Sequence, residues 1–81
     1  MGMLRVLSRN GDDRLTWEMT AVETGDAEAA AAVREAERIF NEQRAGGATA
    51  VRVTPGQPAE RISKFDPDAE EIVMVPRVIG G

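Results

Sequence analysis

The amino-acid sequence predicts an α+β fold in which one mixed β-sheet packs against one amphipathic helix. Three observations lead to this class. Two strand-like segments joined through an Asn-Gly pair open the chain, one long segment has helical periodicity, and a segment that is apolar on both faces lies near the end. The predicted order is β-β-α-β-β-β. With 81 residues, the chain is long enough for one domain with a single core.

The first two elements form a predicted β-hairpin. Residues 3–8 are mostly apolar, and residues 14–20 alternate between apolar and polar side chains, which is typical of a half-buried strand. The apolar positions of the second segment are Leu15, Trp17 and Met19. Between the two segments, the pair Asn10-Gly11 tolerates positive φ angles and therefore favours a tight turn.

The third element is a predicted helix that runs from Ala27 to about Arg44. Its apolar residues recur at the spacing of one helical face, while charged residues fall mostly outside that face. The apolar stripe consists of Ala29, Ala32, Val33, Ala36, Ile39 and Phe40. Asp26 precedes the segment as a helix N-cap residue, and Gly46-Gly47 ends it.

Three further strands are predicted after the helix. Residues 48–54 alternate, residues 60–65 form a short polar strand after a Pro-Gly turn, and residues 72–75 are apolar on both faces. The apolar pair of the first of these strands is Val51 and Val53. An entirely apolar strand suits the centre of a sheet, so we expect the last strand to lie beside the first and parallel to it. Pro76 cannot donate a ladder hydrogen bond, and pairing should weaken there.

The composition argues against several function classes. The chain has no Cys and no His, which excludes disulfides, thiolate metal sites and Ser-His catalysis. A net charge of -4 leaves no basic footprint for nucleic acid, and no apolar run approaches the roughly 20 residues of a membrane span. We therefore expect a cytoplasmic monomer that is not an enzyme, carries no metal or cofactor, and binds neither nucleic acid nor membrane.

The order of elements and the last ten residues resemble the ubiquitin-like β-grasp family. The final stretch is Ile72-Val73-Met74-Val75-Pro76-Arg77-Val78-Ile79-Gly80-Gly81. Ubiquitin likewise ends in an apolar strand, an arginine-bearing tail and Gly-Gly. The stretch is also similar to the end of the sulfur-carrier subunit of molybdopterin synthase, and residues 65–72 are similar to those of small prokaryotic diglycine proteins. Two departures are that Lys64 is the single lysine and that Arg77 stands where sulfur carriers usually have a second proline.

The resemblance implies a β-grasp domain over residues 1–76 and a flexible diglycine tail over residues 77–81. In these families an ATP-using activating enzyme adenylates the terminal carboxylate, which then becomes a thiocarboxylate or a thioester that can be passed to a lysine of a target protein. Gly80 and Gly81 are then the site of activation, because glycine can thread a narrow channel and leaves its carbonyl open to attack. The residues that the enzyme or another partner would bind are Pro76, Arg77, Val78 and Ile79.

Two functions remain open at this point. The first is a protein modifier or sulfur carrier, and Pro76 with the apolar Val78-Ile79 pair favours the carrier. The alternative is a non-covalent binding or assembly module, for example from a phage or mobile-element cassette, that uses one face of the sheet. The apolar residues expected on that face are Leu7, Val73 and Val75, since exposed apolar clusters usually mark interaction sites. We interpret Trp17 as a core residue and the acidic segment 66–71 as a solvated turn.

Overall fold

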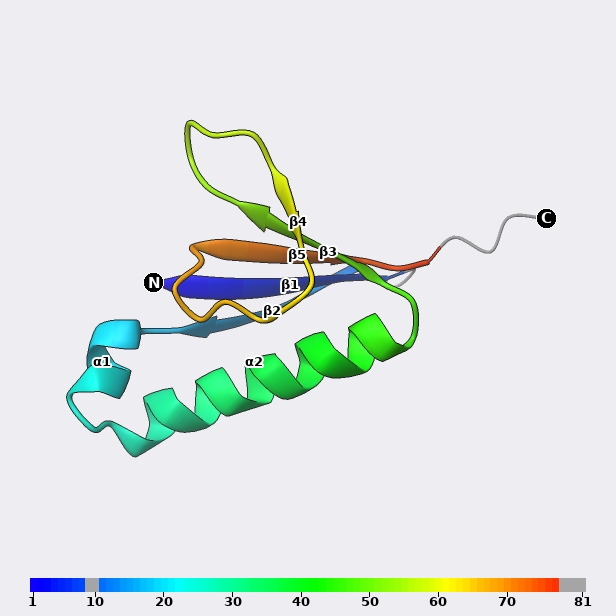
Figure 1. Ribbon diagram of the computed structural model, residues 1–81. Helices are drawn as coiled ribbons and strands as arrows, with labels where there is room; N and C mark the ends of the chain where they lie inside the picture. The colour runs from blue at the N-terminus through cyan, green and yellow to red at the C-terminus, as the bar shows by residue number, and fades with distance from the viewer. Residues whose placement is uncertain (9–10, 78–81) are drawn as a thin grey trace.

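A computed structural model of the chain describes residues 1–8 and 11–77 (Figure 1). Along the described residues the elements are β1 (Gly2–Ser8), β2 (Gly11–Trp17), α1 (Met19–Glu23), α2 (Ala27–Ala45), β3 (Thr49–Val53), β4 (Glu60–Ile62) and β5 (Glu71–Val75). The predicted α+β class is confirmed, whereas the short helix α1 was not expected. The predicted turn at Arg9-Asn10 lies outside the described residues, as do Val78, Ile79, Gly80 and Gly81.

The five strands form one mixed sheet in the order β2-β1-β5-β3-β4. Strands β1 and β5 are parallel, with Leu4 opposite Ile72, and the other neighbouring pairs are antiparallel. The expectation that the last strand lies parallel to the first is therefore confirmed. Helix α2 runs along one face of the sheet (Figure 1), and no other described element covers the opposite face. We call that second side of the sheet the uncovered face.

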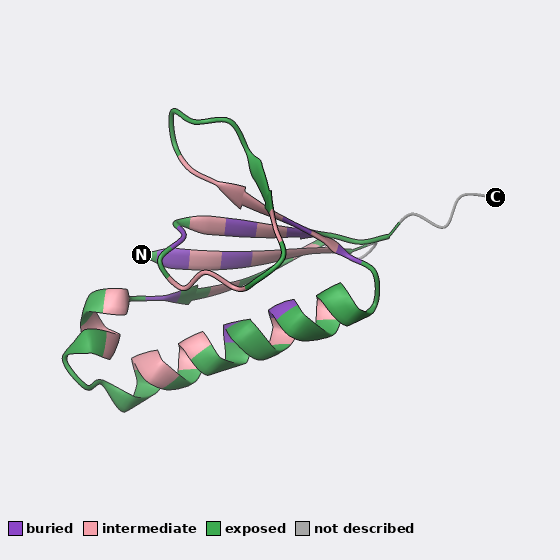
Figure 2. Ribbon diagram, in the orientation of Figure 1, coloured by how far each residue is buried: buried purple, intermediate pink, exposed green. Residues whose placement is uncertain are grey.

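The core lies between α2 and the central strands. Alternation along the strands turns Leu4, Ile72 and Met74 toward the helix, where all three are almost fully buried. Helix α2 contributes Ala36 and Phe40, both with no exposed surface. In Figure 2 the buried residues accordingly follow the middle of the sheet and the facing side of α2.

Aromatic side chains close one end of this core. The interpretation of Trp17 as a core residue is confirmed, since it is only 3% exposed and its indole Nε1 donates a 2.9 Å hydrogen bond to the carbonyl of Pro67. Its ring lies 5.5 Å from that of Phe65, which in turn lies 5.8 Å from that of Phe40. Gly2 is opposite Trp17 in the β1–β2 ladder, and a Cβ at Gly2 would lie 2.2 Å from the indole Cε2. The indole therefore occupies the space that any side chain at position 2 would need.

Both ends of α2 have the predicted caps. The Asp26 Oδ1 accepts hydrogen bonds from the backbone N–H groups of Glu28 and Ala29, at 2.9 and 3.1 Å. At the other end Gly47 has a φ of +97° and donates its N–H to the carbonyl of Arg44, while the next N–H reaches the carbonyl of Gln43. These two bonds form a Schellman motif, which satisfies carbonyls that the end of a helix leaves unpaired.

The ends of β2 and β4 differ from the sequence prediction. Strand β2 ends at Trp17, and Met19 begins α1, although Met19 still packs against the core as the alternation implied. Strand β4 ends at Ile62, because the chain turns so that Phe65 can pack between the other two aromatic rings.

In β3 the buried residue is Ala50, while Val51 and Val53 lie on the uncovered face. The alternation of apolar and polar residues predicts this strand correctly, but it does not determine which of the two faces of the strand packs against the helix.

Candidate functional site at the tail root and the uncovered sheet face

The end of the described chain leaves the domain from the middle of the sheet. Strand β5 lies between β1 and β3, and its last ladder pair joins Val75 to Thr49. Pairing therefore stops immediately before Pro76, as predicted from the missing N–H donor of proline. We call Pro76 and Arg77 the tail root, because the predicted activation residues Gly80 and Gly81 follow it in the sequence.

The tail root lies against the C-terminal end of α2. Its two residues help to line a hollow of about 370 Å³ beside the last turn of the helix and the start of β3. The other residues that line this hollow are Glu42, Gln43, Gly46 and Ala48. A protein that binds the tail would meet the end of α2 at the same time. The sequence prediction had named Pro76 and Arg77 but not the helix residues, because only the β3–β5 register brings them together.

The three apolar candidates from the sheet all lie on the uncovered face. Val73 is opposite Arg5 in the β1–β5 ladder and opposite Val51 in the β3–β5 ladder. Alternation along β1 and β5 places Leu7 and Val75 on the same face as Val73. Val75 is 39% exposed, and Leu7 and Val73 are half-buried. The structure thus brings the three predicted residues to one surface, together with Val51 and Val53 of β3.

A cluster of charged residues crosses the same face. Arg5 on β1 donates to Asp12 on β2, with Nη2 and Oδ2 2.6 Å apart, and to Glu71 on β5, with Nη1 and Oε2 3.1 Å apart. Arg14 donates its Nε to the same Asp12 oxygen at 3.2 Å. Through these bonds Arg5 links three neighbouring strands and neutralises the carboxylates of its two partners. The apolar part of the uncovered face therefore borders a group of mutually paired charges.

The pairing also changes how these groups titrate. Hydrogen bonds from the Arg5 guanidinium hold the pKa of the Asp12 carboxyl below its usual value, and burial only partly opposes this effect. The same hydrogen bonds, first to Asp12 and then to Glu71, raise the pKa of Arg5. Sequence reasoning missed this cluster, because Glu71 is far from the other three members in the chain and only the strand register places all four side by side.

The acidic segment 66–71 is more closely tied to the fold than a solvated turn would be. Asp66 accepts a 2.9 Å hydrogen bond from Arg52 Nη1, and its other oxygen accepts the backbone N–H of Asp68. Glu71 belongs to the Arg5 cluster. The interpretation of this segment as a solvated turn therefore fits Asp68 and Glu70, whereas the half-buried Asp66 and Glu71 have arginine partners on neighbouring strands. Asp68 and Glu70 are exposed.

Across residues 1–8 and 11–77, no three carboxylates lie in a position to hold a metal ion together. Neither described helix is long and apolar enough to cross a bilayer. No protein-family model, curated protein or solved structure matches this chain. The geometry of the tail root and of the uncovered face is therefore the basis for assigning a function.

Proposed function

We propose that the chain is a β-grasp protein whose Gly81 carboxylate is activated by a separate adenylating enzyme, so that it acts as a protein modifier or a sulfur carrier. The observation that carries the proposal is the position of β5, the central strand from which the diglycine-bearing tail continues. The mixed sheet with parallel central strands β1 and β5, covered by one long helix, is compatible with the β-grasp fold. The short helix α1 is an addition to the predicted order.

The proposed chemistry uses the chain as substrate. The Gly81 carboxylate attacks the α-phosphate of ATP and releases pyrophosphate, giving an acyl adenylate. Hydrosulfide delivered by a sulfur donor then attacks the acyl carbonyl and displaces AMP to form a thiocarboxylate, or a cysteine thiolate of the enzyme displaces AMP to form a thioester. The chain contributes the carboxylate and an unhindered glycine carbonyl, and the other groups belong to the enzyme. Because the reaction consumes ATP, we place the protein in the cytoplasm.

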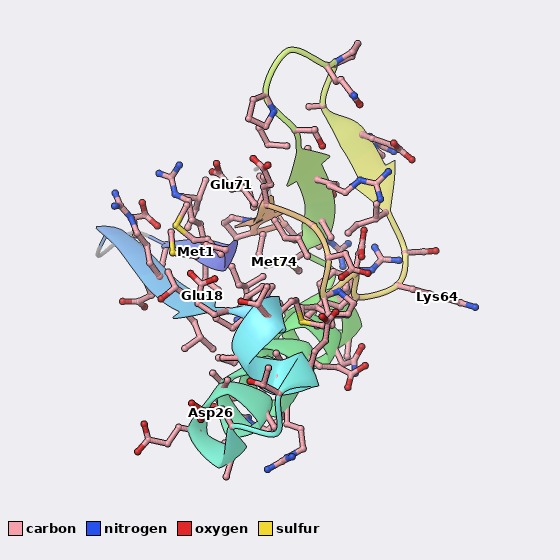
Figure 3. All side chains as sticks on the ribbon, turned by 90° about the vertical axis from the view of Figure 1, so that its left-hand side faces the viewer. Met1, Glu18, Asp26, Lys64, Glu71 and Met74 are labelled. Atoms are coloured by element: carbon pink, nitrogen blue, oxygen red, sulfur yellow. The ribbon has the colours of Figure 1, made fainter. Side chains whose placement is uncertain are left out.

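The single lysine limits what a modifier of this kind could build. Lys64 lies in the exposed segment after β4, and its side chain extends away from the body of the protein (Figure 3). If the chain modifies proteins, Lys64 and the N-terminus are the amines through which copies could be linked to one another. A single lysine is consistent with a modifier whose copies are not linked to one another, and equally with a sulfur carrier.

Deletion of Gly80-Gly81 in the native host tests the proposal. The deletion removes the activated group and leaves every described residue unchanged, so the purified domain should unfold at the same temperature as the wild type. We expect the variant to lose all thiocarboxylate or isopeptide adducts in mass spectra and to lose its cellular function. Full function of the deletion variant would contradict the proposal.

The uncovered face favours a second candidate, a non-covalent binding module. Its apolar residues Leu7, Val73 and Val75 lie together on a side of the sheet that no described element covers. If this face is the functional surface, Val75→Asp should abolish function while deletion of Gly80-Gly81 leaves it intact. Ala31→Asp at an exposed position of α2 is the matched control, because it adds the same charge elsewhere.

A further inference from the structure

We propose that Gly47 is a positioning residue for the tail: it leaves space for the stem of Arg77 and so fixes where the tail leaves the domain. The effect of Gly47 on activation rests on the function proposed above, whereas the contact between Gly47 and Arg77 does not. Gly47 belongs to the turn between α2 and β3, thirty positions before Arg77 in the sequence. Nothing in its local sequence, a helix-ending Gly-Gly pair, distinguishes it from an ordinary helix stop.

The strand register explains why the two residues meet. Strands β3 and β5 are antiparallel, and their last pair is Thr49 with Val75. Continuing that register by two residues beyond the ladder places position 47 opposite position 77. The helix stop and the tail root are therefore held together by the sheet itself.

The contact is tight, so that a Cβ at position 47 would push the stem of Arg77 away by a few tenths of an ångström. A Cβ at Gly47 would lie 3.0 Å from Arg77 Cδ and 3.5 Å from Arg77 Cβ. The other described glycines with a positive φ are Gly11, Gly25 and Gly56, and a Cβ at any of them would meet no atom within 4 Å. Gly47 thus differs from them, because its missing side chain makes room for another part of the molecule as well as permitting the turn.

The surface beside the Arg77 stem is formed by the turn that ends α2. The Schellman bonds from Gly47 and Ala48 tie the turn to the last turn of α2. The C-terminal end of a helix carries partial negative charge, which favours a guanidinium nearby. Arg44 already donates its Nη1 to the carbonyl of Ala48 at 3.4 Å. The stem of Arg77, an exposed residue, therefore lies against a turn that backbone hydrogen bonds tie to α2.

The position of Arg77 limits where the reactive group can go. The predicted activation residues Gly80 and Gly81 come shortly after Arg77 in the sequence, so the position of Arg77 sets where the segment that carries them begins. An enzyme that binds the domain while it reacts with the Gly81 carboxylate needs the two in a defined relative position. A misplacement of a reacting group by about 1 Å can reduce the rate about 100-fold. Moving the tail root should therefore slow activation without altering the tail itself.

Limited trypsin digestion of the purified chain tests the contact without any partner. The variant is Gly47→Ala, and Gly56→Ala is the matched control, because it also places alanine at a positive φ, of +75°, but in open space. Trypsin must take Arg77 into its specificity pocket, which requires the stem to leave Gly47. We expect Gly47→Ala alone to accelerate cleavage after Arg77 at least threefold, relative to cleavage after Arg38 in α2 of the same sample. Equal acceleration in both variants, or in neither, would overturn the proposal.

Expression of the same two variants in the native host tests the consequence for activation. We expect Gly47→Ala to reduce tail-dependent adducts about tenfold and Gly56→Ala to leave them near the wild-type level, at equal amounts of folded protein. Wild-type adducts that persist unchanged in Gly47→Ala would contradict the positioning role alone. A wild type without adducts would instead contradict the proposed function, while the trypsin result would still decide whether the contact exists.

Discussion

Replacing Gly2 by alanine should destabilise the domain strongly, because the Trp17 indole occupies the space of the new methyl group. The ideal Cβ would lie 2.2 Å from indole Cε2, 2.4 Å from Nε1 and 2.5 Å from Cζ2. Ordinary carbon contacts are near 3.5–4.0 Å, so the ring must move by more than about 1 Å. That movement would break the 2.9 Å bond from Nε1 to Pro67 and disturb the packing of Trp17 on Phe65.

The expected magnitude follows from these two losses. Overpacking a core usually costs about 1–3 kcal/mol, and a broken hydrogen bond costs about 1 kcal/mol more. We therefore expect a loss of about 2–4 kcal/mol in the free energy of unfolding. Small domains are stable by about 0.05–0.15 kcal/mol per residue, or about 4–12 kcal/mol at this length, so the loss is a large share of the total.

Urea denaturation followed by the fluorescence of Trp17 measures this effect directly, since the chain contains one tryptophan. Gly46→Ala is the control: its φ is -80°, and its Cβ would make only ordinary contacts at 3.5 and 3.7 Å. We expect that control to stay within about 0.5 kcal/mol of the wild type. If Gly2→Ala also stays within this range, the indole does not fill the space over Gly2 and the reasoning is refuted.

Three further predictions concern stability. Asp26→Ala should lower the free energy of unfolding by about 1 kcal/mol, because two N–H groups at the start of α2 lose their acceptor, and urea denaturation measures this loss. Phe40→Ala should lower the free energy of unfolding by about 3–5 kcal/mol, since it empties a fully buried phenylalanine site, and urea denaturation followed by circular dichroism measures the loss. Asp12 has a lowered pKa in the folded state, so its contribution to stability is present above its ordinary value of 3.8 and is lost as the pH falls through the folded value. Asp12→Asn should therefore flatten the acid side of a stability–pH profile, and an unchanged profile would contradict the pairing with Arg5.

The parts of the fold that depend on local sequence were predictable. Helix α2 has a clear apolar stripe, an N-cap at Asp26 and a Gly-Gly stop, and each of these signals acts within a few residues. The entirely apolar run of residues 72–75 in β5 indicated a central strand and hence its parallel pairing with β1. Helix α1 was missed because its first residues continue the alternation of β2, and Glu18 before it makes no capping bond with its side chain.

The parts that depend on register were not predictable. A period of two marks β3 as a strand, but only its pairing with β5 shows that Val51 faces away from the helix. Because the register of the strands could not be predicted, the hydrogen bonds from Arg5 to Asp12 and Glu71, which join three strands, were not predicted either. The same holds for the approach of Gly47 to Arg77, which follows from the β3–β5 register and from no motif in either segment.

Tryptic mass spectrometry of proteins from the native host tests the proposed activation of Gly81 most directly. Trypsin cleaves after Arg77, so a modified lysine would retain the remnant Val78-Ile79-Gly80-Gly81, and a sulfur carrier would instead yield this peptide with a C-terminal thiocarboxylate. We predict that one of these two species is present and that it disappears in a strain expressing the chain without Gly80-Gly81. Recovery of only the free carboxylate, under growth conditions in which the protein is required, would contradict the proposal.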